Sequence, residues 1–547
     1  MDTNGKKMKR TAIILLLILW MKGGHAHVGS PDVAMEGVAG PYHLLVSIRP
    51  PDVIPGTAKV TVYLQSPADV VVTTQPVYYF SGRKGAPPAE VLQPVAGSPG
   101  AYTGIVWMMQ NGSSSVLLHV KGSKGEGELV VPIVAISTAE KQLPGATSVS
   151  LVILGIILFV LMVTVIGASV GEGITKDGEA LSLRRRRSRR VAFAIAALLT
   201  SLVVYGGNAW WGNWAKRYQH FMFKPMYAEM RINDAHGTNT LEMTIDTSDN
   251  NQRRASLSYL VPDHGKIMHL FLMRLPGLDV FAHVHPDRED TAHFIANLPP
   301  LPAGKYLAFA DIVYSSGFTE TIRDTLTVTK NIAGVTEPHD PDDAYAYALP
   351  NNLMDNPYRN DDNAIICGRP GKGVRMKDGS NMVMDGGLTG GFESGMLYTL
   401  RFAVYDSSRQ PVKLEPYMGM QGHAVIVKND GNTYIHIHPV GTYSVAAQAN
   451  LERRIGSPDK EYNYDNRVRF RDSVDQLIRT LKGMPEQERT TLLMRQMNMS
   501  PDTMGGMKMD NSVTFPYTFP QPGLYRIWVQ VKHNGQVLTA AFDREVK

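Results

Sequence analysis

Short runs in which apolar and polar residues alternate recur along most of the chain. Six such runs fall between residues 27 and 147, separated by proline and glycine, and the alternation returns after residue 225. Alternation over four to eight residues is typical of a strand with one buried face. The pattern predicts a mainly β protein built from Ig-like β-sandwich domains, the first of them at 27–147.

Two uninterrupted apolar runs break this alternation. Residues 148–170 and 191–211 are each long enough to cross a bilayer as a helix. Six arginines lie between the two runs, in residues 184–190. Because arginine-rich loops stay on the cytoplasmic side, we expect two transmembrane helices joined by a cytoplasmic loop at 171–190.

The first 26 residues have the composition of a secretory signal peptide. Four basic side chains precede a short apolar run, and Gly-His-Ala at 24–26 offers a small-residue cleavage site. Cleavage there would leave His27 as the N-terminus, where amine and imidazole can together chelate copper; an uncleaved anchor is the alternative. This start places residues 27–147 and 215–547 on the periplasmic side of a bacterial inner membrane.

The region after the second apolar run contains one pattern twice: an apolar strand, a tight turn, and a second strand that ends in His-x-His-Pro. The histidines are His269, His283 and His285 in the first copy and His423, His436 and His438 in the second. Folding each hairpin about its turn puts its three imidazoles on one face, with His269 opposite His285 and His423 opposite His438. The repeat predicts tandem sandwiches at 225–330 and 364–547, joined by a linker at 331–363.

Three imidazoles on one face suit copper or zinc. Soft thioether donors stand next to them in sequence, at Met268, Met418 and Met420. The alternative is a structural role, in which the histidines hydrogen-bond turns or line the wall of a sandwich.

The last sandwich carries an amphipathic insertion at about 451–512, in which we expect two helices broken at 483–485. Its end is rich in methionine: Met494, Met497, Met499, Met504, Met507 and Met509. Because thioethers select Cu(I), this segment is a candidate Cu(I) site. A flexible loop whose methionines pack loosely or bind a partner is the alternative.

Composition narrows the function classes. The net charge of +5 is partly due to the arginine cluster, so no general basic surface points to nucleic acid. The single cysteine, Cys367, excludes an intrachain disulfide and a cysteine-based zinc or iron–sulfur site. No serine–histidine–aspartate set, phosphate loop or carboxylate pair with a mechanistic context is recognisable, so we do not expect an enzyme.

Several motifs of the last sandwich occur together: Gly422-His423, His-x-His-Pro at 436–439 and Pro-Gly-x-Tyr-x-x-Trp-x-Gln at 522–530. In this the chain resembles the YtkA-like, heavy-metal-associated β-sandwich family of bacterial periplasmic proteins. The preceding sandwich departs from the pattern, with Met268 before its histidine and Ala308 and Ala310 in place of the Trp and Gln. Residues 27–147 resemble the FixH/YtkA-like domains through short motifs at 27–31, 36–42 and 54–56. The resemblance implies metal handling, most of all of copper.

The sequence therefore predicts a membrane-anchored extracytoplasmic protein that binds copper, with zinc as a second possibility, for sequestration, delivery or resistance. Its expected partner is a copper pump, a copper chaperone or an oxidase subunit. The alternative is a non-catalytic assembly or interaction factor for a membrane complex such as a respiratory oxidase, with structural histidines. Of the two hairpins, the second has the fuller motif and is the better predicted site.

Overall fold

The computed structural model describes residues 32–67, 69–140, 143–173, 178–235, 238–248, 256–333, 340–349, 364–366, 373–385, 391–457, 465–496 and 510–547. The expected signal peptide and His27 lie outside these residues. The chain divides into two units, one made of Met1–Pro50, Pro55–Ala135 and Pro225–Lys547, the other of Pro51–Ile54 and Ile136–Lys224. The first unit holds nearly all of the β structure, and the second holds the two apolar helices.

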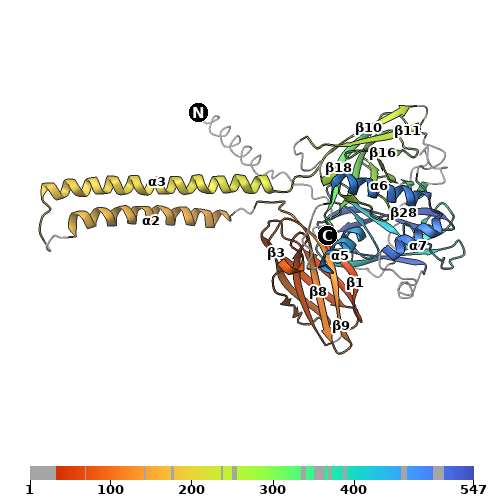
Figure 1. The fold of residues 1–547 in the computed structure, drawn as a ribbon, viewed down its shortest axis with the longest axis horizontal. Coiled ribbons are helices and arrows are strands. Elements are labelled where there is room, and N and C mark those ends of the chain that lie inside the picture. Colours follow the sequence, from red (N-terminus) through yellow and green to blue (C-terminus); the bar gives the residue numbers. More distant parts are fainter. Residues whose placement is uncertain are drawn as a thin grey trace, which may run out of the picture. The chain divides into compact units, whose positions relative to one another are not determined.

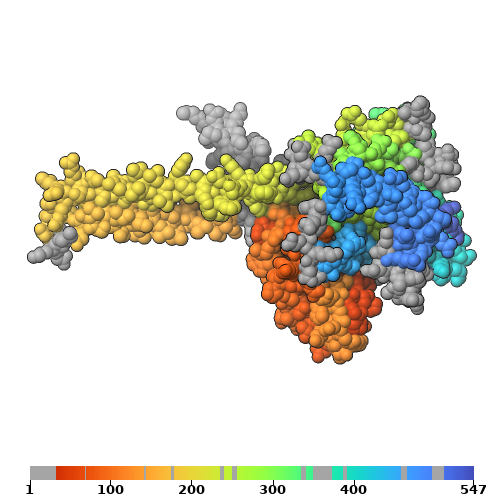
Figure 2. Space-filling view, viewed as in Figure 1, coloured from red at the N-terminus to blue at the C-terminus, as the bar shows by residue number. Residues whose placement is uncertain are grey.

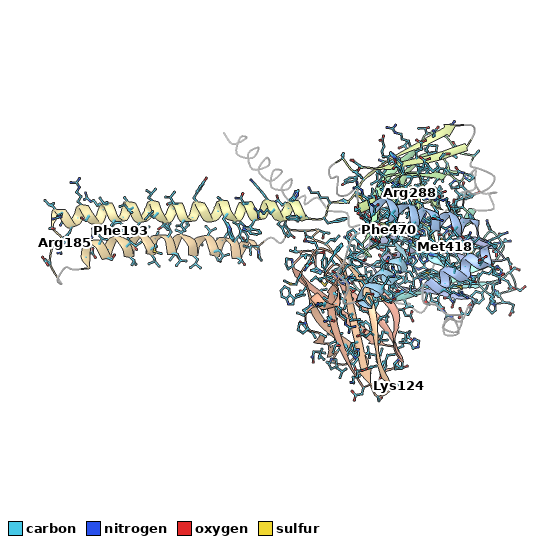
Figure 3. All side chains as sticks on the ribbon, viewed as in Figure 1. Lys124, Arg185, Phe193, Arg288, Met418 and Phe470 are labelled. Carbon is cyan, nitrogen blue, oxygen red and sulfur yellow. The ribbon has the colours of Figure 1, made fainter. Side chains whose placement is uncertain are left out.

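The second unit is a helical hairpin of α2 (Gly145–Glu172) and α3 (Leu183–Phe221) (Figure 1). Both helices are long and apolar enough to cross a membrane. The two helices are in close contact at Gly167, where any side chain would clash with the ring of Phe193 (Figure 3). Arg189 of α3 also forms an ion pair with Glu172 of α2 at 2.6 Å. The arginines of 184–190 form the first turns of α3 instead of a loop, because arginine is a good helix former and the Ser182 side chain caps the helix.

The N-terminal sandwich of the first unit confirms the β prediction for this region. One sheet has the order β1–β2–β3–β7–β6 and the other β5–β4–β8–β9. The strands are β1 (Val33–Ala39), β2 (Tyr42–Arg49), β3 (Gly56–Leu64), β4 (Val70–Tyr78), β5 (Glu90–Val91), β6 (Gln93–Pro94), β7 (Ala101–Met108), β8 (Gly112–Gly122) and β9 (Gly125–Ala135). Every second residue of β2 is buried, which is the burial that alternation predicts.

The first tandem sandwich consists of a small sheet, β10–β11–β16–β15, and a larger sheet, β12–β17–β13–β14–β19–β20, with β18 paired to β17. Its strands are β10 (Ala228–Ala235), β11 (Thr238–Ile245), β12 (Leu260–Val261), β13 (His269–Arg274), β14 (Val280–Val284), β15 (Asp287–Arg288), β16 (His293–Asn297), β17 (Gly304–Tyr314), β18 (Thr319–Val328), β19 (Ala344–Leu349) and β20 (Ala364–Ile366). The expected linker at 331–363 is thus partly wrong: the Ala-Tyr alternation of β19 adds a strand beside β14.

The second tandem sandwich has the sheets β21–β22–β23–β26 and β25–β24–β27–β28. Its strands are β21 (Val374–Arg375), β22 (Asn381–Met384), β23 (Leu397–Tyr405), β24 (His423–Lys428), β25 (Tyr434–Ile437), β26 (Ser512–Thr518), β27 (Gly523–His533) and β28 (Gln536–Val546). The tandem arrangement of sandwiches after the second helix is confirmed.

The larger sheet of the first tandem sandwich packs against the sheet of β24 and β27. Leu270 and Leu272 lie in the core shared with the small sheet, whereas Phe271 and Met273, which alternate with them, join the core of the second sandwich. Phe281 stacks on Trp528 with ring centroids 4.8 Å apart. The hairpins β13–β14 and β24–β25 therefore face each other across one interface, here called the central interface.

Three helices, α5 (Val445–Ile455), α6 (Arg467–Gly483) and α7 (Glu486–Gln496), form the insertion and part of the molecular surface (Figure 2). The predicted break between two helices at 483–485 is confirmed, while α5 precedes the expected insertion. Arg288 anchors α6 through Asp475 at 2.5 Å (Figure 3). Leu451 and Ile455 of α5 pack with residues of β4, β8 and β9, so α5 ties the N-terminal sandwich to the tandem pair.

The central interface should be the main stabilising contact of the tandem pair. We expect Trp528→Ala to lower the free energy of unfolding by about 3–5 kcal/mol, because it removes a fully buried ring and leaves a cavity. Urea unfolding of the detergent-solubilised chain measures this. The control is Trp107→Ala, in which the lost ring is half exposed and the shift should stay within about 0.5 kcal/mol. Equal shifts in the two variants would contradict the assignment.

Candidate metal centre

Both histidine hairpins have the predicted register. Leu270 pairs with Val284 and Ala424 with Ile437, so one step further His269 lies opposite His285 and His423 opposite His438. On each strand, the side chains two or four positions away from these histidines also point into the central interface. Each hairpin therefore presents its three imidazoles on one face, as the repeat pattern predicts.

The two hairpins lie close together, which the sequence did not predict. Because the hairpins face each other, their six imidazoles meet in one buried cluster, here called the histidine cluster. His436 of the second hairpin lies 5.2 Å from His269 of the first, measured between ring centroids, and 5.4 Å from His423. The two sheets must be packed before these rings come together, which a pattern within one hairpin does not reveal.

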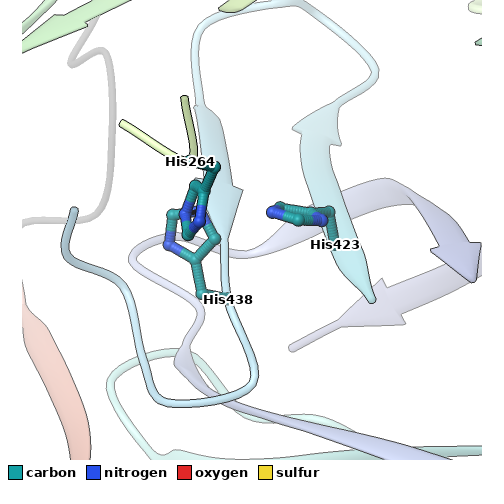
Figure 4. A group of neighbouring side chains, drawn as sticks. All are labelled: His264, His423 and His438. Carbon is teal, nitrogen blue, oxygen red and sulfur yellow. Dashed lines mark hydrogen bonds between the residues drawn. The ribbon is translucent and has the colours of Figure 1, made fainter. Parts of the chain in front are cut away.

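A seventh histidine, His264, was missed by sequence reasoning. It precedes β13 in a tight turn whose ends, Asp263 and Lys266, pair with each other, and its φ of 51° is followed by Gly265 at 81°. Its Nε2 lies 3.2 Å from Nε2 of His438, and His264, His423 and His438 form one possible three-ligand group (Figure 4). The signal was present as a His-Gly turn five residues before the first repeat histidine.

A second three-ligand group is formed by His269, His283 and His285. Nδ1 of His269 lies 3.1 Å from Nε2 of His283, and the rings of His283 and His285 are 4.5 Å apart. Within each group the candidate nitrogens lie within 4.8 Å of one another. An ion bound at about 2.0–2.1 Å to each nitrogen needs nitrogens roughly 3–4 Å apart, so small ring rotations suffice.

Hydrogen bonds on the outside of the histidine cluster fix the tautomers of three rings. His269 Nε2–H donates to the carbonyl of Asp263 at 3.2 Å, and His438 Nδ1–H donates to the carbonyl of Tyr443 at 2.9 Å. His285 Nδ1–H donates to the carboxylate of Asp343 at 2.8 Å. Because these partners only accept, the other nitrogen of each neutral ring must present a lone pair to the cluster. This is the outer arrangement of metal-binding histidines.

Two further rings are held by residues from the opposite sandwich. Oε1 of Gln530 on β27 lies 2.9 Å from Nδ1 of His283, and Oδ2 of Asp311 on β17 lies 3.5 Å from Nδ1 of His436. Gln530 is paired in register with His423, and Asp311 with His269. Each sandwich thus uses one late-strand residue to orient a histidine of the other. The sequence alignment that put Ala308 and Ala310 at these positions is wrong by one residue: Phe309 and Asp311 occupy them.

Several ring nitrogens inside the histidine cluster have no hydrogen-bond partner among the described residues. They are both nitrogens of His423, Nδ1 of His264, Nε2 of His285 and Nε2 of His436. A buried polar atom without a partner destabilises the fold by about 1–3 kcal/mol. Five such atoms in one small volume indicate that the folded chain is built to receive a ligand there.

Burial favours the neutral form of five rings of the cluster. Desolvation lowers the pKa of His269, His283, His423 and His438 well below the ordinary value, and neighbouring imidazoles lower it further. The pKa of His264 is also lowered by burial. Neutral imidazole is the form that binds a metal ion, since its lone pair is free.

A charged network closes one side of the cluster. Lys266 pairs with Asp340 and, at 2.8 Å, with Asp342. Burial alone would raise the pKa of Asp340, but Lys266 holds it well below its usual range. Asp340 and Asp343 also form a possible ligand group with His285. These acidic residues were not among the predicted site residues, because they lie in the stretch taken for a linker.

The methionines predicted as ligands have different positions. Met268 packs in the core behind β13, on the face opposite His269, so it does not join the cluster. Met418 and Met420 are buried in the turn before β24, and Met494 lies on α7. Outside the described residues lie Met497, Met499, Met504, Met507 and Met509.

Comparison with known proteins gives little further information. A family model for a domain of unknown function (DUF8832) matches residues 377–462 and 497–547. No curated protein matches the chain.

Matches among solved structures are remote. They include dimeric latent PorU from Porphyromonas gingivalis (7% identity, TM-score 0.13, 95% of this chain and 34% of that one) and a mutant alpha-2-macroglobulin from Salmonella (10%, 0.18, 93% and 24%). A protein from Corynebacterium diphtheriae described as membrane-anchored matches at 7% identity and a TM-score of 0.12, over 95% and 99% of the two chains. The chain spans about a third of the length of the first structure and about a quarter of the second.

Removing the charge of Lys266 should destabilise the protein. We expect Lys266→Met to lower the free energy of unfolding by about 3–5 kcal/mol, because two buried carboxylates lose their nearest counter-ion and keep only the more distant Lys482 and Arg489. Urea unfolding at neutral pH is the measurement. Lys305→Met, at an exposed position on β17, is the control and should leave stability unchanged. A neutral result for Lys266→Met would mean that the carboxylates are not charged in the fold.

The metal-free protein should lose stability in mild acid. The folded-state pKa of five cluster histidines, His264, His269, His283, His423 and His438, lies below that of the unfolded chain, so the unfolded state binds more protons between that folded pKa and about 6.5. Stability therefore falls as pH decreases through this window, by up to about 1.4 kcal/mol per pH unit for each histidine. Urea midpoints between about pH 7.5 and 5.5 in chelator test this.

Two variants isolate the source of this pH dependence. His423→Gln should flatten the profile, whereas His293→Gln, at an exposed position, should keep the wild-type profile. A wild-type midpoint that does not change over this range would show that the cluster histidines are not buried in their neutral form.

Proposed function

We propose that this protein is a membrane-anchored metal-binding protein that binds copper, with zinc as the second candidate, through the histidine cluster. The observation that carries the proposal is the set of buried imidazoles whose inward nitrogens have no partner among the described residues. Imidazole suits both Cu and Zn, and copper generally binds such nitrogen sites more tightly than zinc does. The sequence resemblance to YtkA-like proteins supports copper in particular.

Two features support a place at the membrane. The hairpin of α2 and α3 is apolar over most of its length, which supports membrane association. The arginines at the start of α3 support a cytoplasmic position for the hairpin tip, and so a periplasmic position for the β sandwiches at a bacterial inner membrane. In this arrangement the protein would sequester copper, deliver it or give resistance to it outside the cytoplasm, together with a copper pump, a chaperone or an oxidase subunit.

The rival function is an assembly factor whose histidines are architectural. An architectural histidine in a core is held by hydrogen bonds at its ring nitrogens, since an unpaired buried nitrogen is unfavourable. Among the described residues His423 has no such partner at either nitrogen, so the arrangement favours metal binding. The methionine-rich segment that follows α7 would supply soft donors for Cu(I). The histidine cluster does not need these donors to bind a metal ion.

Metal binding should depend on the cluster histidines. We expect the full-length, detergent-solubilised protein, stripped with chelator, to bind Cu(I), Cu(II) or Zn more tightly than micromolar. His423→Ala and His283→Ala should each weaken binding by about 100-fold or more, because ligands matter at least as much as outer-sphere residues, whose loss costs 10–100-fold. Competition titration with a chromophoric chelator gives the affinities.

The control is His293→Ala, which removes an exposed imidazole outside the cluster and should leave every affinity unchanged. Thermal melts of the three metal-free variants confirm that they fold. If the wild-type protein binds none of the three ions, the proposed function is wrong; if it binds but the cluster variants match the control, the ligand assignment is wrong.

A further inference from the structure

An approximate two-fold symmetry relates the two tandem sandwiches across the central interface. Phe309 of the first stacks on Tyr434 of the second at 4.0 Å, and Trp528 of the second stacks on Phe281 of the first at 4.8 Å. The pairs occupy equivalent strand positions, since Phe309 lies two residues before Asp311 and Trp528 two before Gln530. The sandwiches therefore pack as an internal pseudo-dimer.

The same symmetry relates two turns that precede the hairpins. The turn of His264 and Gly265 has its equivalent in Met418 and Gly419, which have nearly the same φ values, 49° and 80° for the latter pair. Each turn stands five residues before the first histidine of its own repeat. His264, from the first sandwich, groups with histidines of the second. The cluster is thus composed of two halves, and the half that contains His423 and His438 is completed by a residue of the first sandwich.

The halves contain two three-ligand groups that share no residue: His269, His283 and His285 form one, and His264, His423 and His438 the other. His436 belongs to neither and lies between them, with ring centroids 6.0 Å from His283 and 4.5 Å from His438. Rings from the two groups approach one another directly, as His264 and His269 do at 6.1 Å.

We propose that the histidine cluster is a two-ion centre, with one copper ion in each three-histidine group and His436 between them. This deepens the proposed function, on which it rests. One ion could not reach all of the inward nitrogens, because a tetrahedral site takes four ligands and the cluster has seven rings. Two ions also account for unpartnered nitrogens in both halves, on His285 and on His423. At these ring separations the unpaired electrons of two Cu(II) ions interact.

The test uses the full-length, metal-free protein in detergent, titrated with Cu(II). Bound copper is measured by mass spectrometry and the spin count by electron paramagnetic resonance. We expect two cluster equivalents in the wild type, with a spin count that follows bound copper over the first equivalent and falls below it over the second, together with a half-field signal.

Variants assign the ions to the groups. His283→Ala and His423→Ala should each lose one equivalent and the half-field signal, and the double variant should lose both equivalents. His293→Ala should behave as wild type. Differences between variants remove the contribution of copper bound elsewhere in the chain.

Three outcomes are distinguishable. One cluster equivalent in the wild type, lost entirely in either single variant, overturns the two-ion centre and leaves the proposed function intact. Two equivalents without any magnetic interaction also overturn it, because the ions would then be far apart. No difference in bound copper between the wild type and the double variant means that the cluster binds none, and the proposed function itself fails.

Discussion

A buried neutral imidazole has one N–H that needs an acceptor and one lone pair that needs a donor or a cation, and this requirement governs the centre of the molecule. Backbone carbonyls of Asp263 and Tyr443 and the carboxylate of Asp343 satisfy the N–H groups from outside. The lone pairs then point at one another, as at the 3.1 Å contact of His269 with His283. Such a core is unfavourable by itself, and its sheets are held together by the aromatic stacks beside it.

The duplication of the sandwich explains how this arrangement can be built from ordinary parts. A single hairpin offers three imidazoles on an otherwise apolar face, and alone it would expose that face to water. Packing two copies face to face buries both faces at once. It also lets Asp311 and Gln530, which stand beside the first histidine of their own repeats, reach a histidine of the other. The same strand position therefore serves as a neighbour in one sandwich and as an orienting group for its counterpart.

Much of the fold could be predicted, because alternation and turn residues act locally. The register of both hairpins, the two apolar helices and the break at 483–485 follow from residues close together in the sequence. The shared cluster could not be predicted, since it depends on contacts between residues far apart in the sequence, such as His264 and His438, which are 174 positions apart. His264 was missed because it is a single histidine in a turn, and β19 because prolines and aspartates around it resemble a linker.

The first unit is discontinuous: the helical hairpin is inserted between two stretches of chain that fold together, and α5 fastens the N-terminal sandwich to the later ones. For a chain made from its N-terminus, this order has a consequence. The first sandwich must wait for about three hundred further residues before the helix that fastens it exists. If both apolar helices enter a bilayer, an odd number of crossings would leave the two parts on opposite sides. Docking of α5 on the first sandwich would then report that membrane insertion had succeeded.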